Sequence, residues 1–218
     1  MTPPRLIPLV EQFDFAYERL AARMSGPFMD SGDGTQTQVD APLTDEEYLW
    51  EPVPDCWSVR RRTDGPGPRA TLLAGAGDWG RDAAAYPHPW PPPFTTLAWR
   101  LSHLSEMLAL RADHTAGTHA LTRDDHPVSG TAAEAVAAFE AGAAAWRKAL
   151  LGLDDTALDT TGYCTYPHGS DPEEPLLDIV WWVNQELLHH GAEIAVLRDL
   201  YRYRRGGNPG ARETLGPV

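Results

Sequence analysis

The stretch LLDIVWWVNQELLHHGAEIAVLRDLYRY, residues 176–203, decides the fold of this chain. It contains no proline and a single glycine, which predicts one long helix over the whole segment. Its apolar residues Ile179, Val183, Ile194 and Leu197 fall on one side of such a helix, at roughly 100° per residue. That side is therefore expected to pack into a helical core.

Two polar residues, Glu186 and His190, interrupt this apolar face one helical turn apart. Burying a carboxylate and an imidazole without partners costs several kcal/mol, so something must compensate them. A metal ion is a natural candidate, because a Glu and a His at i and i+4 present two ligands to one point. A buried charge pair between the two, or exposure to solvent at a helix end, remain open as alternatives.

Three further segments carry helical patterns, at about residues 6–24, 95–114 and 131–151. A capping box formed by Thr44 and Glu47 also predicts the start of a short helix. Four long helices with no strong strand pattern between them predict an all-α protein built as a four-helix bundle. The chain of 218 residues suits a single domain over residues 1–218.

The segment 51–93, between the first two long helices, is rich in proline and glycine and cannot form a long helix. A disordered linker rarely contains as many large aromatic side chains as this segment does. These aromatic residues are Trp57, Trp79, Tyr86 and Trp90. We therefore expect an ordered excursion packed over the bundle, with a short hairpin around residues 57–62. We also expect a loop over residues 30–40.

The composition argues against two classes of partner. The chain has 31 acidic and 18 basic residues, a formal net charge of −13. A nucleic-acid binder needs a basic face to neutralise phosphates, and the sequence has no such stripe. It also has no apolar run near the roughly 20 residues of a membrane span, and no uninterrupted apolar signal core at its start. We expect a cytoplasmic protein that binds a small molecule, with no nucleic-acid or membrane partner.

The second long helix carries an anomaly that matches the one in the last helix. His103 stands among apolar residues of that helix, which are Leu97, Trp99, Leu101, Leu104, Met107, Leu108 and Leu110. With Glu186 and His190 it would complete a two-His, one-carboxylate set that leaves open positions for water or substrate. Such a set suits a zinc hydrolytic site or a non-haem iron site, and spacing does not separate them. A His on an apolar face is also commonly a core residue with an ordinary hydrogen bond.

The other polar candidates are weaker. His189 points roughly 100° away from His190 and is expected at the rim of the site, supporting the ligands. The remaining histidines are expected to be exposed in loops or at helix ends: His88, His114, His119, His126 and His168. Cys164 is a weak nucleophile candidate, and with Cys56 it makes no disulfide framework. Arg198 and Asp199 are expected to form structural ion pairs.

The motifs TTLAWRLSHL (95–104) and NQELLHHGAEI (184–194) resemble the DinB-like superfamily. The segments 43–50 and 56–60 also look like actinobacterial members of that group. These are metal-binding four-helix bundles related to mycothiol-dependent maleylpyruvate isomerases and bacillithiol transferases. Their usual ligands are a His on the second helix and a His-x-x-x-His pair on the last. His103 and His190 match two of these ligands, whereas Glu186 replaces the third.

The resemblance implies a divalent metal, zinc first with nickel or iron as alternatives, and a low-molecular-weight thiol. The expected activity is that of a mycothiol-type S-transferase or isomerase acting on a small electrophile, in a pocket lined by Trp99, Met107 and Trp57. A homodimer is also implied. The alternative is a non-catalytic metal-binding bundle with a stress-response or ligand-sensing role. A metal-free bundle in which Glu186 and His190 pair is the third hypothesis.

Overall fold

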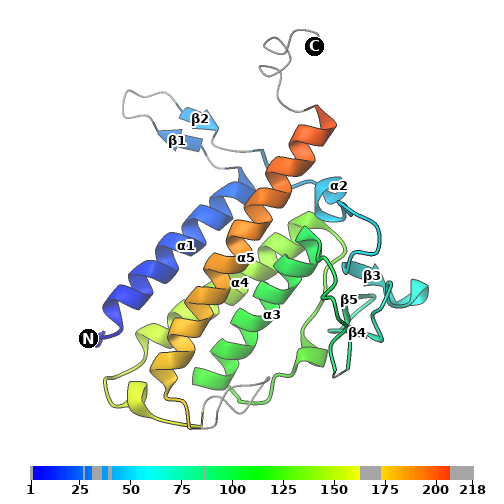
Figure 1. The fold of residues 1–218 in the computed structure, drawn as a ribbon. Helices are drawn as coiled ribbons and strands as arrows, with labels where there is room; N and C mark the ends of the chain where they lie inside the picture. Colours follow the sequence, from blue (N-terminus) through cyan, green and yellow to red (C-terminus); the bar gives the residue numbers. More distant parts are fainter. Residues whose placement is uncertain are drawn as a thin grey trace.

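Four long helices form the body of the molecule in the computed structural model, which describes residues 2–26, 28–30, 36–38, 41–85, 87–162 and 173–206. They are α1 (Ile7–Ser25), α3 (Leu97–Ala116), α4 (Ala132–Leu151) and α5 (Leu176–Arg205) (Figure 1). Contacts run from α1 to α5, from α5 to α3, from α3 to α4 and from α4 back to α1, so the helices close a ring around one core. This confirms the predicted helical bundle.

Local chemistry explains where the helices begin and end. The Thr96 hydroxyl accepts a hydrogen bond from Trp99 N at 3.2 Å at the start of α3, and Thr131 does the same for α4. Helices α1 and α5 end at Gly26 and Gly206, whose φ angles of 68° and 78° are left-handed conformations that favour glycine. A residue with a side chain would be strained at these φ values.

The core is made of the apolar stripes that the sequence predicted. Ile179, Val183, Ile194 and Leu197 of α5 are all at most 4% exposed. They pack with buried side chains of the other helices, among them Phe13, Leu20, Leu101, Leu104, Leu108, Phe139 and Trp146. Helices α3 and α4 pack very closely, since a Cβ on Gly142 would stand 3.1 Å from Ser105 O. The alanine-rich composition of α4 permits this approach.

Between α1 and α3 the chain makes short elements. They are β1 (Phe28–Asp30), β2 (Gln36–Gln38), α2 (Asp45–Tyr48), β3 (Val59–Arg61), the 3₁₀ helix η1 (Arg62–Asp64), β4 (Leu72–Ala74) and β5 (Trp79–Ala83). Two more 3₁₀ helices, η2 (Arg123–Asp125) and η3 (Ala157–Asp159), follow α3 and α4. The antiparallel pair β1–β2 overlaps the segment 30–40, for which we expected a loop.

The excursion at 51–93 contains a three-stranded antiparallel sheet in the order β3-β5-β4. The hairpin expected around residues 57–62 is wrong, because β3 pairs with β5 some twenty residues later, with Val59 opposite Arg81. We call residues 51–93 the insert. The insert contacts α3 through β3 and β5 (Figure 1).

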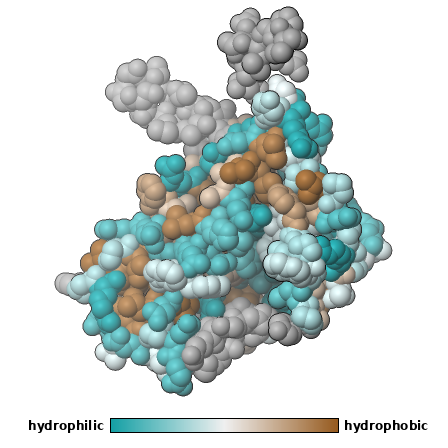
Figure 2. Space-filling model, in the orientation of Figure 1, coloured by the Kyte–Doolittle hydropathy of each residue, from teal (hydrophilic) through white to brown (hydrophobic). Residues whose placement is uncertain are grey.

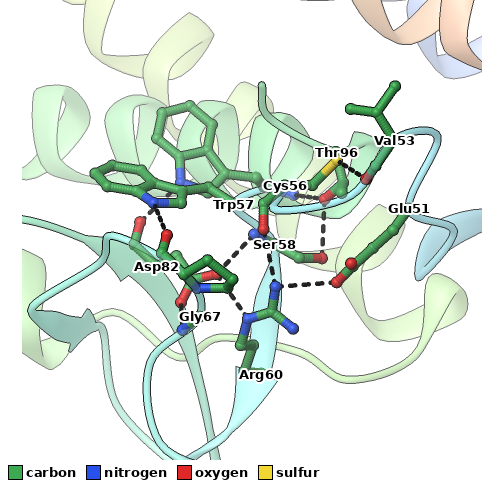
Figure 3. A network of polar contacts seen from close by, with 11 residues as sticks. Glu51, Val53, Cys56, Trp57, Ser58, Arg60, Gly67, Asp82 and Thr96 are labelled. Carbon is green, nitrogen blue, oxygen red and sulfur yellow. Dashed lines mark hydrogen bonds and ion pairs between the residues drawn. The ribbon is translucent and has the colours of Figure 1, made fainter. Parts of the chain in front are cut away.

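A buried carboxylate holds the insert together (Figure 3). Asp82 is fully buried and accepts hydrogen bonds from Ser58 N at 2.9 Å, Gly67 N at 2.7 Å and Arg60 Nε at 2.8 Å. The Ser58 hydroxyl in turn accepts a hydrogen bond of 2.9 Å from the hydroxyl of Thr96, the residue that caps α3. These bonds fix the sheet to the beginning of α3.

Hydrophilic residues cover much of the face seen in Figure 2, with hydrophobic residues gathered in patches between them. The large exposed apolar side chains of α1 and α5 are Ile7, Phe15, Trp181, Leu188, Val196 and Tyr203. Among the described residues, no helix combines the length and apolar character that crossing a membrane requires.

Candidate metal centre

The structure brings His103 of α3 together with Glu186 and His190 of α5. One ligand atom of each residue lies within 4.8 Å of those of the other two. His103 Nε2 is 3.2 Å from Glu186 Oε2, and His190 Nε2 is 3.3 Å from the same oxygen. Two imidazoles from different helices thus converge on one carboxylate oxygen, which is the grouping expected from the sequence.

Helix geometry accounts for this convergence. Glu186 and His190 lie one turn apart on α5, so both side chains project from the same face. His103 meets them because α3 packs against α5. The three side chains are between 13% and 22% exposed, so the cluster is shielded from bulk water without being sealed.

The protonation states suit metal binding. Burial lowers the pKa of His103 to about 4, against the opposing effect of its hydrogen bond with Glu186. The hydrogen bond with His103 is the largest cause that holds the pKa of Glu186 well below its usual range. At neutral pH the cluster therefore presents a neutral imidazole at His103 and an ionised carboxylate at Glu186, the forms in which both groups ligate metals.

Glu193 orients His190. His190 Nδ1 lies 2.6 Å from Glu193 Oε2, and the guanidinium of Arg100 also contacts this carboxylate. A carboxylate only accepts hydrogen bonds, so the tautomer of His190 that carries its proton on Nδ1 donates that proton to Glu193. In neutral His190 this leaves Nε2 with a lone pair aimed at Glu186.

The Nδ1–H tautomer of His190 therefore sets two acceptors against each other. In neutral His190 the Nε2 lone pair faces Glu186 Oε2 across 3.3 Å. A shared proton or a cation removes the repulsion between the His190 nitrogen and the Glu186 oxygen, and a cation can be bound by both atoms at once. The three residues thus fit a metal ion by geometry as well as by type.

Trp99 closes one side of the cluster. Its ring stacks on His103 with 5.5 Å between centroids and 25° between planes, and meets His190 edge-on at 6.5 Å. Of the three residues expected to line a substrate pocket, Trp99 contacts the two cluster histidines. Met107 belongs to the hydrophobic core, and the indole N–H of Trp57 is donated to Pro68 O within the insert.

His189 lies at the exposed edge of this region. Its side chain is 59% exposed, its ring stacks on His190, and its Nε2 is 3.4 Å from Glu193 Oε1. The residue in direct contact with a cluster histidine through its Nδ1 is Glu193, which the sequence reasoning missed. A signal was present, since Glu193 is three residues after His190 and so on the same side of α5.

Three cavities in the described structure lie away from the cluster. A groove of about 740 Å³ runs between α3 and α4, one of about 320 Å³ lies in the insert, and one of about 260 Å³ lies between α1 and α5. None of the three is lined by His103, Glu186 or His190. The expected pocket of Trp99, Met107 and Trp57 is not among them and stays a prediction.

The other candidates fall in several places. His126 was expected to be exposed, but it is buried with Nε2 3.1 Å from Ser105 Oγ, because the chain after η2 folds back onto α3. His88 and His119 are exposed, and His114 is half-buried with Nε2 2.8 Å from Leu121 O. Cys56 is a buried free thiol. Tyr86, Cys164 and His168 lie outside the described residues.

Comparison with known protein families identifies one that includes the candidate metal centre. A family model described as the DinB superfamily matches residues 35–194, a range that contains the insert, α3, α4 and all three cluster residues. No curated protein and no solved structure matches the chain. Since the family model spans well over half of the 218 residues, the chain belongs to the DinB superfamily.

Proposed function

We propose that this protein holds a divalent cation with His103, Glu186 and His190 and acts as a thiol-dependent S-transferase or isomerase on a small electrophile. The observation that carries the proposal is the convergence of both imidazole Nε2 atoms on Glu186 Oε2, at 3.2 and 3.3 Å. Two nitrogens and one oxygen suit zinc, and nickel or iron are the alternatives. Three protein ligands leave room for a substrate group.

When bound, such a cation would supply Lewis acidity that lowers the pKa of a thiol or a water beside it. The chain's own residues have separate tasks. Glu186 provides the negative charge of the site, and Glu193 keeps the proton of His190 on Nδ1. Trp99 covers one side with an apolar ring, which keeps water away from His103.

Elemental analysis of protein purified without an affinity tag tests the metal site. We expect about one divalent ion per chain, and loss of that ion in a Glu186→Ala/His190→Ala double variant. His119→Ala removes an exposed histidine outside the cluster and should keep the ion. A metal content that is equal in the double variant and in the wild type would overturn this assignment.

The activity is tested with a thiol and a small electrophile mixed with metal-loaded protein. We expect the loaded wild type to accelerate thioether formation, and the His103→Ala variant to fall to the rate of the metal-free protein. Mycothiol and simpler thiols should be compared as donors, because the thiol is the less specified reactant. No acceleration by the loaded wild type over the His103→Ala variant would refute the enzymatic proposal.

A second candidate is a non-catalytic metal-binding bundle with a ligand-sensing or stress-response role. One observation favours it, namely that the three cluster side chains are only 13–22% exposed and so are largely covered by the protein. It predicts stoichiometric metal and a higher melting temperature with metal, but no turnover. The cytoplasmic location and the homodimer stay predictions, and sedimentation analysis tests the latter.

A further inference from the structure

The insert contacts Trp99 of α3, and Trp99 contacts His103 of the candidate metal centre. The ring of Trp99 stacks on His103 and lies under the guanidinium of Arg81, and its indole N–H is bonded to β5. Because Trp99 is on the first turn of α3, whereas its partners Arg81 and Asp82 are on β5, this contact links two separate elements.

The edge of the indole is fixed by a hydrogen bond. Trp99 Nε1 donates to the backbone oxygen of Asp82 at 2.8 Å. That backbone is itself held, because the Asp82 side chain accepts three hydrogen bonds from Ser58, Arg60 and Gly67 (Figure 3). The acceptor for the indole is therefore part of a rigid network and not of a loose loop.

The guanidinium of Arg81 covers Trp99. Its Cζ lies 5.0 Å from the ring centroid, within the range of a cation–π contact. Arg81 is buried, and its Nη2 is 2.5 Å from Glu106 Oε2 of α3. A buried Arg–Glu pair has a fixed geometry, since separating the two would leave an uncompensated charge. Arg81 therefore holds its place above the indole.

We infer that Trp99 is a positioning residue for His103, and that the insert exists in part to hold it. The inference rests on the proposed metal site. A histidine side chain on a helix can rotate about two bonds, and a flat ring stacked at 25° restricts the rotation that would turn Nε2 away from Glu186. Groups that orient metal ligands commonly change metal affinity by roughly 10- to 100-fold.

Variants of Trp99 test this with cobalt(II) as the probe. Trp99→Leu removes both the stacking and the N–H donor, and we expect cobalt to bind about 10- to 100-fold more weakly, with altered visible absorption. Trp99→Phe keeps a flat ring without the donor, so a smaller loss is expected. Affinity is measured by competition with a chelator, independently of any catalysed reaction.

Trp79→Leu is the matched control. Trp79 is on β5 itself and packs against Gly130 and Arg61, away from the three cluster residues. Without metal, this variant should melt at a lower temperature than the wild type. Its affinity for cobalt and its cobalt spectrum should be the same as those of the wild type. A purely structural role for Trp99 would make Trp99→Leu behave in the same way, and that result overturns the inference.

The two proposals fail differently. A wild type that binds no cobalt, zinc, nickel or iron would overturn the metal site and this inference with it. If the wild type binds cobalt and the Trp99→Leu and Trp99→Phe variants bind it with the same affinity as the wild type, the role of Trp99 is overturned but the metal site is not. Circular dichroism of the metal-free variants shows whether a loss comes from unfolding, and Trp99→Phe is the milder variant if Trp99→Leu does not fold.

Discussion

Glu193 contacts three basic side chains, those of His190, His189 and Arg100. Residue spacing along the helices identified the candidate ligands. It also suggested that His189 supports them, because His189 is next to His190 but points about 100° away from it. The Nδ1–H of a ligating histidine also needs an acceptor, and the carboxylate of Glu193 supplies one beside His190. Asking which nearby residue could accept that proton would have identified Glu193 from the sequence.

Glu193→Gln should therefore weaken metal binding. The amide keeps the size of the side chain, but it removes the negative charge that raises the basicity of His190. We expect about a 10-fold larger dissociation constant for zinc, measured by competition with a chelator. Glu18→Gln, which removes an exposed charge from α1, is the control and should have no effect. Equal affinities of the two variants would contradict the role of Glu193.

His126 should make stability depend on pH. Burial, and secondarily the charge of Arg81, lower its pKa in the folded protein to about 4 from 6.5. The unfolded chain thus binds the proton first as pH falls, so the contribution is complete above about pH 6.5 and is lost toward pH 4. Between pH 7 and pH 4.5 we expect the wild type to lose about 2 kcal/mol more than His126→Gln in urea unfolding. A difference that is the same at both pH values would exclude this effect.

At the scale of elements, helices and their caps followed from local patterns, whereas the sheet did not. The hydroxyls of Thr96 and Thr131 cap α3 and α4 near the expected starts of these helices. Strands β3 and β4 have three residues each, too few for an alternating pattern to stand out. Moreover, β5 contains Arg81 and Asp82, which are buried only because each finds a partner distant in sequence. Such a strand looks like a solvent-exposed loop until its partners are known.

The predicted capping box at α2 is half formed, and this has a consequence for α5. Thr44 Oγ1 accepts a hydrogen bond from Glu47 N, but the Glu47 carboxylate accepts hydrogen bonds from Arg198 at 2.7 and 3.0 Å. Both side chains are almost completely buried. The ion pairs expected of Arg198 and Asp199 are present, with Glu47 and Arg23 respectively. Helix α2 is thereby fixed to α5.

Arg198→Met should be strongly destabilising, because it removes both short hydrogen bonds to the buried Glu47 carboxylate and leaves it only Arg202 Nε at 3.9 Å. We expect a loss of roughly 3–5 kcal/mol in the free energy of unfolding, measured with urea. The double variant Glu47→Met/Arg198→Met leaves no buried charge and should be more stable than Arg198→Met alone. If the double variant is instead the less stable of the two, the loss comes from packing and not from charge.

At the scale of the whole molecule, the candidate metal centre joins α3 to α5, two helices that also pack on each other. Helix α3 forms a pair with α4, and α5 forms a pair with α1. A cation held by His103, Glu186 and His190 would link the two pairs, and so should stabilise the bundle against unfolding. Zinc at 100 times its dissociation constant adds about 2.7 kcal/mol by mass action. For a chain of this size that is a rise of roughly 5–10 °C in melting temperature.

Calorimetry with zinc, and then with excess chelator, measures this rise. His103→Ala should abolish it, since that variant removes the only ligand that α3 contributes to the cluster described here. His119→Ala should retain it, because His119 is exposed and lies beyond the end of α3. A rise of the same size in His103→Ala would mean that zinc stabilises the protein from elsewhere. The link between the two helix pairs would then not be the source of the stabilisation.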